Sequence, residues 1–274
     1  MLPSSKAIKK TARRALNGNW VRCVGVSLVL VLALAFCAVF AETIFAIFST
    51  YIHTPNGKLT VPGFVIALTC TAVIAFFVFP LCEGVVRWFW FFTLEKERPV
   101  SEIFYYYSNR VYLIGSVYLA LRLIARLAAV AVACYLPAVL VWSLANGTFY
   151  SLSGYSDGDT TAVLKPLLYV FTALSTLLLV KIAVRYSLAP VIAVINEDID
   201  ARSAIALSAT IARRYKNAYF NVLVSFIGWI VLSVLGVTML YTLPFLFVSY
   251  TVFCRFAINS YRTDCCVRGE KPLI

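Results

Sequence analysis

Six cationic side chains interrupt the apolar segments of this 274-residue chain, and their types and placement suit the binding of an anion. Arginine binds phosphate through two parallel N–H donors, and lysine adds a compact positive charge. An ionisable residue inside a membrane segment is a functional hypothesis by default. The six candidate ligand-binding residues are Arg87, Arg122, Arg126, Lys181, Arg185 and Arg255.

Counting about 1.5 Å per helical residue predicts that all six lie at a similar depth, near one face of a membrane. Glu83 precedes Arg87 by one helical turn and is the acid expected in the same band, so it is the candidate ion-pair partner. One carboxylate cannot balance six cations, so some of them must reach headgroups, water or a bound anion. The sequence favours Arg185 and Arg255 as a clamp on one phosphate. The alternative is that each cation snorkels separately to the headgroups.

Other chemistry finds little support in the sequence. There is no G-x-S-x-G, P-loop or H-E-x-x-H motif, and no carboxylate is predicted at mid-membrane, where a proton-coupled transporter normally has one. His53 is the only histidine, and the eight cysteines are scattered without a C-x-x-C pair. The sequence therefore predicts a protein that is not an enzyme, with no cofactor, metal site or disulfide framework.

The composition places the chain in a membrane. Hydrophobic residues make up 62% and charged residues only 13%, against roughly 25% charged in a soluble domain. The mean hydropathy is +0.87. A net charge of +12 suggests nucleic acid in a soluble protein, but here the basic residues flank apolar segments. These values exclude a soluble enzyme, a disordered chain and a nucleic-acid-binding protein, and they indicate a polytopic membrane protein.

Six segments are long and apolar enough to cross the hydrocarbon as helices. The predicted fold class is therefore all-α, a transmembrane bundle of six spans with interfacial amphipathic helices on the cytoplasmic side. The spans are expected at about 21–50, 62–92, 127–145, 167–195, 220–239 and 241–260.

The flanking cations predict the orientation. Sixteen Lys and Arg residues fall on one side of the six-span arrangement, whereas the opposite loops hold only Lys58 and Lys165. The positive-inside rule then places both termini in the cytoplasm and residues 145–165 outside.

Two segments are predicted to be amphipathic helices that lie at the membrane surface. Residues 5–17 carry five cations opposite an apolar face, and Gly18 ends that helix. Residues 200–216 form a second, with Asp198 or Asp200 as its cap. Residues 101–121 are expected to lie flat as a third. The predicted organisation is an interfacial helix at 1–20, a six-span domain at 21–261 and a cytoplasmic tail at 262–274.

Several short stretches of the chain form a recognisable pattern: 18–20, Pro80-Leu81 with Gly84 and Arg87, 185–190, 196–198, Ala204-Ile205 with Ser208, Lys216 with Phe220, and 225–229. Together they resemble a bacterial family of multi-pass membrane proteins of unknown function. The family is distantly similar to the membrane domain of glycerophosphodiester phosphodiesterases. The chain departs from it where Ala138 follows Pro137 and where Ile199 follows Asp198. The resemblance implies an all-helical protein of the bacterial inner membrane and carries no activity with it.

We expect a protein that binds anionic lipid or another phosphate-bearing amphiphile at the inner leaflet. A small-solute transporter or permease component is the alternative, favoured if helices broken at Pro80, Pro137 and Pro190 line a water-filled cavity. An intramembrane enzyme is disfavoured by the missing catalytic motifs. The expected partners are membrane lipids, together with a second copy of the chain or another membrane protein.

Overall fold

The computed structural model describes residues 3–48, 61–96, 98–145, 158–196, 199–233 and 238–269, and every element within them is a helix. The elements are α1 (Ser5–Leu16), α2 (Trp20–Ile47), α4 (Val61–Thr93), η1 (Val100–Phe104), α5 (Tyr105–Ser108), α6 (Arg110–Ala145), α8 (Gly158–Ala183), η2 (Val184–Tyr186), α9 (Ala189–Ile195), α10 (Ala201–Arg214), α11 (Lys216–Ser233) and α12 (Met239–Val267).

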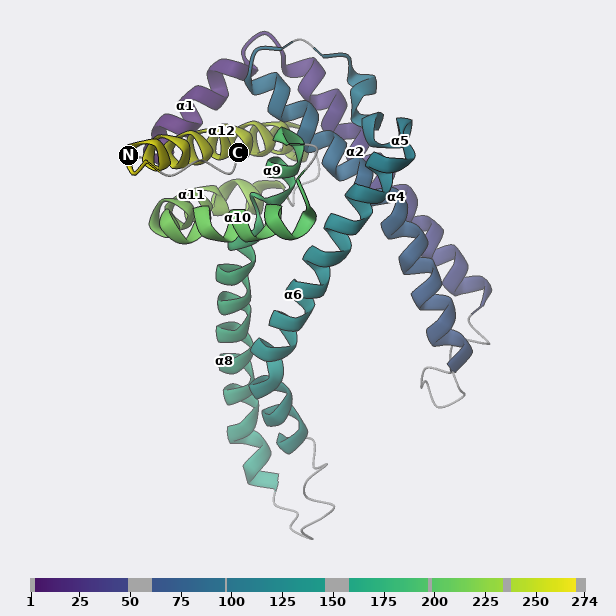
Figure 1. Ribbon diagram of the computed structural model, residues 1–274. Coiled ribbons are helices and arrows are strands. Elements are labelled where there is room, and N and C mark those ends of the chain that lie inside the picture. The colour runs from purple at the N-terminus through teal and green to yellow at the C-terminus, as the bar shows by residue number, and fades with distance from the viewer. Residues whose placement is uncertain are drawn as a thin grey trace.

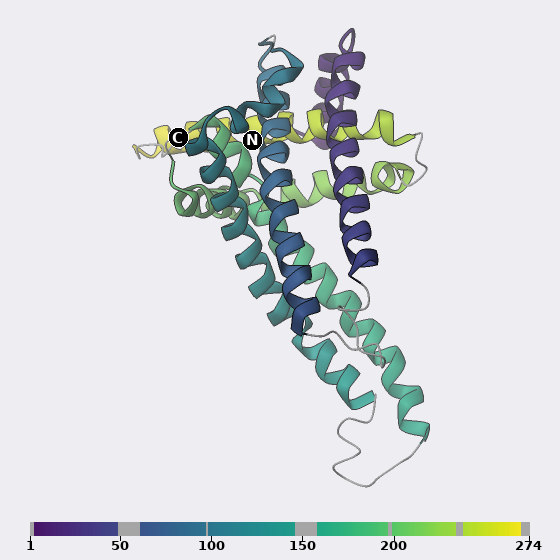
Figure 2. The same ribbon diagram turned by 90° about the vertical axis from the view of Figure 1, so that its right-hand side faces the viewer.

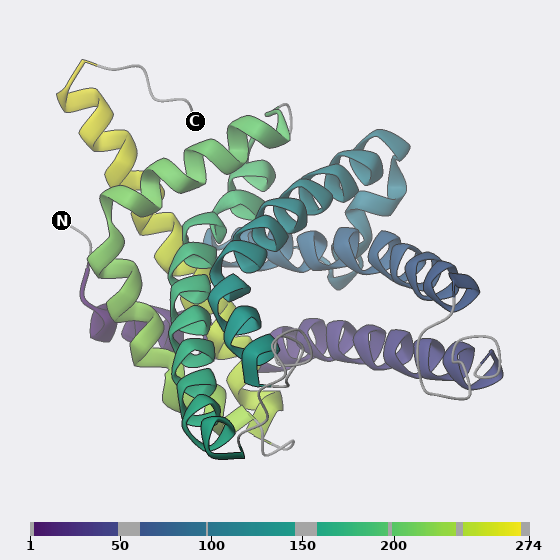
Figure 3. The same cartoon turned by 90° about the horizontal axis from the view of Figure 1, so that it is seen from below.

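The long helices form two pairs that extend from a common layer (Figure 1). Helices α2 and α4 lie side by side in one pair, and α6 packs along α8 in the other. Helices α10, α11 and α12 run crosswise to α8 at the end where both pairs meet (Figures 1 and 2). Seen from below, the α2–α4 pair projects away from the α6–α8 pair (Figure 3). Helix α12 connects the parts, because it contacts α1, α2, α4 and α11.

Five stretches are long and apolar enough to cross a membrane, which agrees with a multi-pass membrane protein. They are α2, α4, most of α6, Pro166–Ile195 and α12. Helix α11, which covers part of the predicted fifth span, is not among them. The structure thus supports an all-helical membrane protein, and a sixth span is not confirmed.

Helix α6 differs from its prediction. Residues 101–121 do not form a separate flat helix, because α6 runs without interruption from Arg110 to Ala145. No proline precedes Pro137 in this stretch, so the backbone has no reason to break before the predicted span. Helix α6 continues through Pro137, and α4 continues through Pro80. The break expected near Pro190 is present, because η2 and a turn separate α8 from α9 there.

The two predicted amphipathic helices are present, but protein covers their apolar faces. In α1, the side chains of Ile8, Ala12 and Leu16 are fully buried, and the helix packs on α12 and α11. In α10, the predicted apolar face packs against η2, α9 and α6. Asp200 caps α10 as predicted, by accepting a hydrogen bond from the backbone N–H of Arg202 at 3.2 Å.

Helix α12 extends beyond its prediction. It continues to Val267, so residues 262–267 are helical and not part of a free tail. The Cys265 side chain, expected in that tail, is buried in the core. The ring of Phe247 stacks on Phe89 of α4 with centroids 5.1 Å apart, and Tyr241 stacks on Trp20 at 4.5 Å. Aromatic packing of this kind fixes α12 across the ends of α2 and α4.

A polar clamp joins the end of α10 to the end of α12. The hydroxyl of Tyr215 donates to Asp264 Oδ2 at 2.7 Å, and Arg214 Nη2 lies 2.9 Å from the same oxygen. Burial, followed by the hydrogen bond to Asp264, raises the pKa of Tyr215 to about 12. The folded state therefore holds the Tyr215 proton more firmly than the unfolded chain, where the tyrosine pKa is about 10.

We predict that Tyr215→Phe lowers the free energy of unfolding by about 1–2 kcal/mol at neutral pH, because it removes a hydrogen bond to a charged acceptor. A raised pKa stabilises the fold fully below pH of about 10, and this contribution is lost as the pH rises towards about 12. The difference between wild type and variant should therefore shrink over that range in thermal unfolding of the purified protein. Tyr169→Phe, on an exposed face of α8, is the control. A constant difference from neutral pH to pH 11 would contradict the assignment.

Candidate functional site

The candidate site depends on a close approach between η1 and α4. A Cβ atom added at Gly84 would lie 1.8 Å from the carbonyl oxygen of Ile103, so no side chain fits there. Ile103 itself is fully buried. Because position 84 has no side chain, η1 lies directly on α4. The contact is made at Ile103, and η1 ends at the next residue, Phe104.

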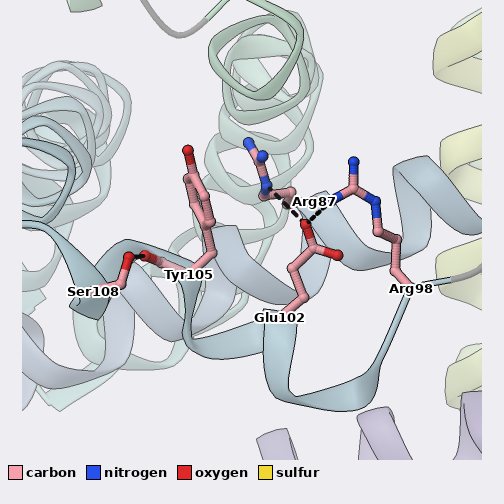
Figure 4. Close-up of polar contacts among 5 residues, drawn as sticks. All are labelled: Arg87, Arg98, Glu102, Tyr105 and Ser108. Carbon is pink, nitrogen blue, oxygen red and sulfur yellow. Dashed lines mark hydrogen bonds and ion pairs between the residues drawn. The ribbon is translucent and has the colours of Figure 1, made fainter.

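This approach places Glu102 of η1 beside Arg87 of α4 (Figure 4). Arg87 Nε lies 3.8 Å from Glu102 Oε1, and both side chains are more than nine-tenths buried. The Arg87 guanidinium also lies 3.7 Å from the ring centroid of Tyr105, a cation–π contact. Glu102, which the sequence analysis did not connect with Arg87, is thus the carboxylate that pairs with it. The predicted partner, Glu83, instead has Ser116 of α6 beside its carboxyl group.

A second arginine shares the same carboxylate. Arg98 Nη1 lies 2.6 Å from Glu102 Oε1, and Figure 4 shows Arg87 and Arg98 reaching Glu102 from two sides. The spacing of four residues between Arg98 and Glu102 was a signal in the sequence for this pair. Arg98 is the more exposed of the two, and it faces a cavity.

That cavity, about 620 Å³ in volume, lies among α1, α2, α4 and α12. One wall is aromatic and aliphatic, formed by Trp88, Phe92, Val252 and Phe256. Asn19, the N-cap of α2, also lines it and makes no side-chain capping bond. Within the described part of the chain, the charged side chains around it are five cations and one carboxylate. They are Arg14, Arg22, Lys96, Arg98 and Arg255, with Glu95.

Arg255 stands at the C-terminal end of α4. Its Nη1 donates to the backbone carbonyl of Thr93 at 2.7 Å, and a cation is favourable there because the carbonyl end of a helix is partly negative. Two residues further, Glu95 has φ +58°, a conformation that favours glycine. The N–H of Glu95 bonds to Phe92 and that of Lys96 to Phe91, the pattern of a Schellman helix end. This reversal of the chain turns Glu95 and Lys96 towards the cavity.

The remaining predicted ligands lie on the α6–α8 pair. Ser175 Oγ donates to the Cys134 carbonyl at 2.7 Å, which sets the antiparallel register of the two helices. In this register Arg126 on α6 is level with the end of α8, near Lys181 and Arg185. All three side chains are exposed. Arg122, on the same helix, lies over the ring of Tyr118 at 4.3 Å.

The six predicted cations thus divide into two groups. Arg255 lines the cavity and Arg87 lies behind its wall, whereas Arg122, Arg126, Lys181 and Arg185 are not among the residues that line it in the described chain. Arg185 is not among the described residues that line the cavity with Arg255. The sequence analysis missed Arg14, Arg22, Lys96 and Arg98 as candidates because it counted them only as orienting charges outside the membrane.

The fold and this cavity define an all-helical protein whose helices are apolar enough to span a membrane. The chain matches the family described as protein of unknown function (DUF975) over residues 1–259, and it belongs to that family. No curated protein and no solved structure matches it. The family resemblance seen in the sequence is therefore confirmed. No similarity to glycerophosphodiester phosphodiesterases is shown.

The described residues contain no group of three His, Cys, Asp or Glu side chains able to hold a metal ion, and His53 lies outside them.

We predict that Gly84→Ala destabilises the protein by about 2–3 kcal/mol, because the new methyl group must push η1 away from α4. Hydrogen exchange should increase in residues 100–108, which make up η1 and α5. Gly115→Ala is the matched control, since a Cβ there meets nothing within 4 Å and alanine favours the helix. Unchanged thermal unfolding and unchanged exchange in Gly84→Ala would show that η1 does not depend on this contact.

Proposed function

We propose that the cavity binds the phosphate group of an anionic lipid, or of a similar phosphate-bearing amphiphile, at the cytoplasmic face of the bacterial inner membrane. The observation that carries the proposal is the charge of the cavity, because the described residues that line it include five cations and one carboxylate. Gathering like charges is unfavourable, and an anion bound between them offsets that repulsion. Arginine, four of the five cations, suits phosphate because its donors form a planar fork.

The rest of the lining supports an amphiphile over a free ion. Trp88, Phe92 and Phe256 supply an apolar wall next to the cations, so a ligand with both a charged and an apolar part matches it. Arg22 lies in the first turn of α2, and Lys96 follows the end of α4. Because α2 and α4 are candidate spans, the cavity is at the boundary between hydrocarbon and water, where lipid headgroups lie.

The orientation of this boundary follows from the cations. The cavity takes its charges from the segments that the positive-inside rule assigns to the cytoplasm, including the N-terminal helix. We therefore place both termini and the cavity on the cytoplasmic side. The protein acts in this proposal as a non-enzymatic lipid-binding component, without nucleic acid as a partner.

Transport is the weaker hypothesis. Its sequence signal was a set of helices broken at prolines, but α4 and α6 are continuous through Pro80 and Pro137. Neither these two residues nor Pro190 is among the described residues that line the cationic cavity.

Arg14→Gln is the cleanest test, because Arg14 is exposed on α1 and lines the cavity. Purified protein in neutral detergent should gain thermal stability when phosphatidylglycerol is added, and high salt should reduce the gain. We expect about tenfold weaker lipid binding in Arg14→Gln, from loss of one charge-assisted hydrogen bond. Arg14→Gln combined with Arg255→Gln should lose less than the sum of the single losses, because both side chains contact one ligand.

Arg126→Gln is the matched control, since Arg126 is an exposed arginine on α6 outside the cavity. Inorganic phosphate and glycerol 3-phosphate, added separately, distinguish a free anion from a lipid. Stabilisation by these two at the concentrations effective for the lipid would contradict the amphiphile. Equal small losses of lipid binding in the single variants Arg14→Gln, Arg255→Gln and Arg126→Gln would instead indicate that each cation snorkels separately to the headgroups.

A further inference from the structure

Helix α12 is apolar enough to span a membrane, but its C-terminal half has an exposed polar stripe, part of which lines the cationic cavity. Arg255, Asn259 and Thr263 follow one another at intervals of four residues, so they form one stripe, and all three are exposed. A helix that crosses hydrocarbon exposes apolar side chains, because a polar or charged one facing lipid is costly. The C-terminal half of α12 therefore does not face lipid hydrocarbon.

The burial of α12 explains its apolar sequence in another way. In its most apolar stretch 61% of the residues are buried inside the protein, against 6–22% in the other four candidate spans. Phe245, Val248 and Phe253 of α12 belong to the core that α1, α4 and α11 also form. Protein, and not lipid, covers these side chains. Apolarity in α12 is thus the property of a core helix.

The neighbours of α12 have the same character on their outer faces. Helix α1 buries Ile8 and Leu16 and exposes Lys6 and Lys10, and α10 exposes Arg202 and Arg213. A charged outer face requires water or headgroups.

Helix α11 is the exception, because its outer face is apolar. Phe220, Val224, Ile227 and Val231 are 46–64% exposed and recur at intervals of three or four residues. The opposite side of α11 buries Tyr219 and Phe226 against α12. This stripe resembles the apolar outer faces of the long helices, and two lysines lie on the same helix or contact it. Lys9 of α1 donates to the carbonyl of Ser225 at 2.5 Å, and Lys216 begins the helix.

The direction of these helices agrees with their surfaces. Helices α10, α11 and α12 run crosswise to α8 and across the ends of α2 and α4 (Figures 1 and 2). Two helices at right angles cannot both stand along the membrane normal. The lipid-exposed pairs α2–α4 and α6–α8 are the ones whose outer faces are apolar, so they define the normal.

We propose that α1, α10, α11 and α12 form a layer parallel to the membrane on its cation-rich side, and that neither α11 nor α12 crosses the bilayer. The partner of this layer is the lipid itself. The stripe of Phe220, Val224, Ile227 and Val231 lies in the boundary between headgroups and acyl chains, as in a monotopic amphipathic helix. Helices α2, α4, α6 and α8 with α9 then make four crossings. An even number keeps both termini on one side.

Depth along α11 tests the proposal. A nitroxide spin label is placed on cysteines introduced at positions 220, 224, 227 and 231 of the cysteine-free full chain, reconstituted in phosphatidylethanolamine–phosphatidylglycerol vesicles. A crossing helix changes depth by about 16 Å over these eleven residues. The in-plane helix places all four labels at the same shallow depth, measured by collisions with oxygen and with a nickel complex. A steady change in depth would overturn the proposal.

Labelling from each side of the membrane gives an independent test. Leu240 and Asn259 are both exposed and lie near opposite ends of α12. In the proposed layer, Leu240→Cys and Asn259→Cys react with an impermeant maleimide from the same side, together with Lys216→Cys. Val61→Cys, at the exposed start of α4, reacts from the other side as the control. Reaction of Leu240→Cys only from the side of Val61→Cys would overturn the proposal. All these positions are exposed, so the substitutions do not disturb the core.

Discussion

The contact of the Ile103 carbonyl with Gly84 is the constraint on which the cationic end of the protein depends. It fixes η1 on α4, and η1 carries Glu102 to the buried guanidinium of Arg87. A buried arginine without a carboxylate costs several kcal/mol, so the fold needs η1 in this place. The chain between Thr93 and η1 is consequently held at both ends. Its Lys96 and Arg98 side chains then have little freedom except to line the cavity.

The cavity and the ion cluster behind it have different electrostatic roles. Glu102 has two arginines around it, and these ion pairs hold η1 on α4. Among the described residues that line the cavity there are five cations and one carboxylate, so the cations outnumber the acids there. That carboxylate, Glu95, occupies a backbone conformation in which glycine is easier.

The sequence was sufficient for features that depend on neighbouring residues. The two amphipathic helices, the Asp200 cap and the break before Pro190 follow from spacing and from local backbone chemistry. The pairing of Arg87 with Glu102 did not, because it joins two elements through a turn whose path depends on packing at Gly84. The cavity was also out of reach, since its cations come from four separated segments. Their shared location depends on where α12 and α1 pack.

Hydropathy, like residue spacing, does not show how distant helices pack, and α12 is an example. Apolar length measures the need to leave water, and a protein core meets that need as well as hydrocarbon does. The difference lies on the residues that remain exposed, which include the polar stripe of Arg255, Asn259 and Thr263 on α12 but the apolar Phe220 and Val231 on α11.

The same reasoning separates anchoring cations from binding cations. Eighteen uncharged residues lie between Arg126 and Ala145 on α6, so Arg126 stands about 28 Å from the far end of the helix, close to the thickness of the hydrocarbon. An exposed arginine at that distance reaches the headgroups without help from the protein. Arg255 differs because its guanidinium turns inward to the Thr93 carbonyl and shares a cavity with other cations. Depth in the membrane is similar for many of these residues, and what each side chain faces decides its role.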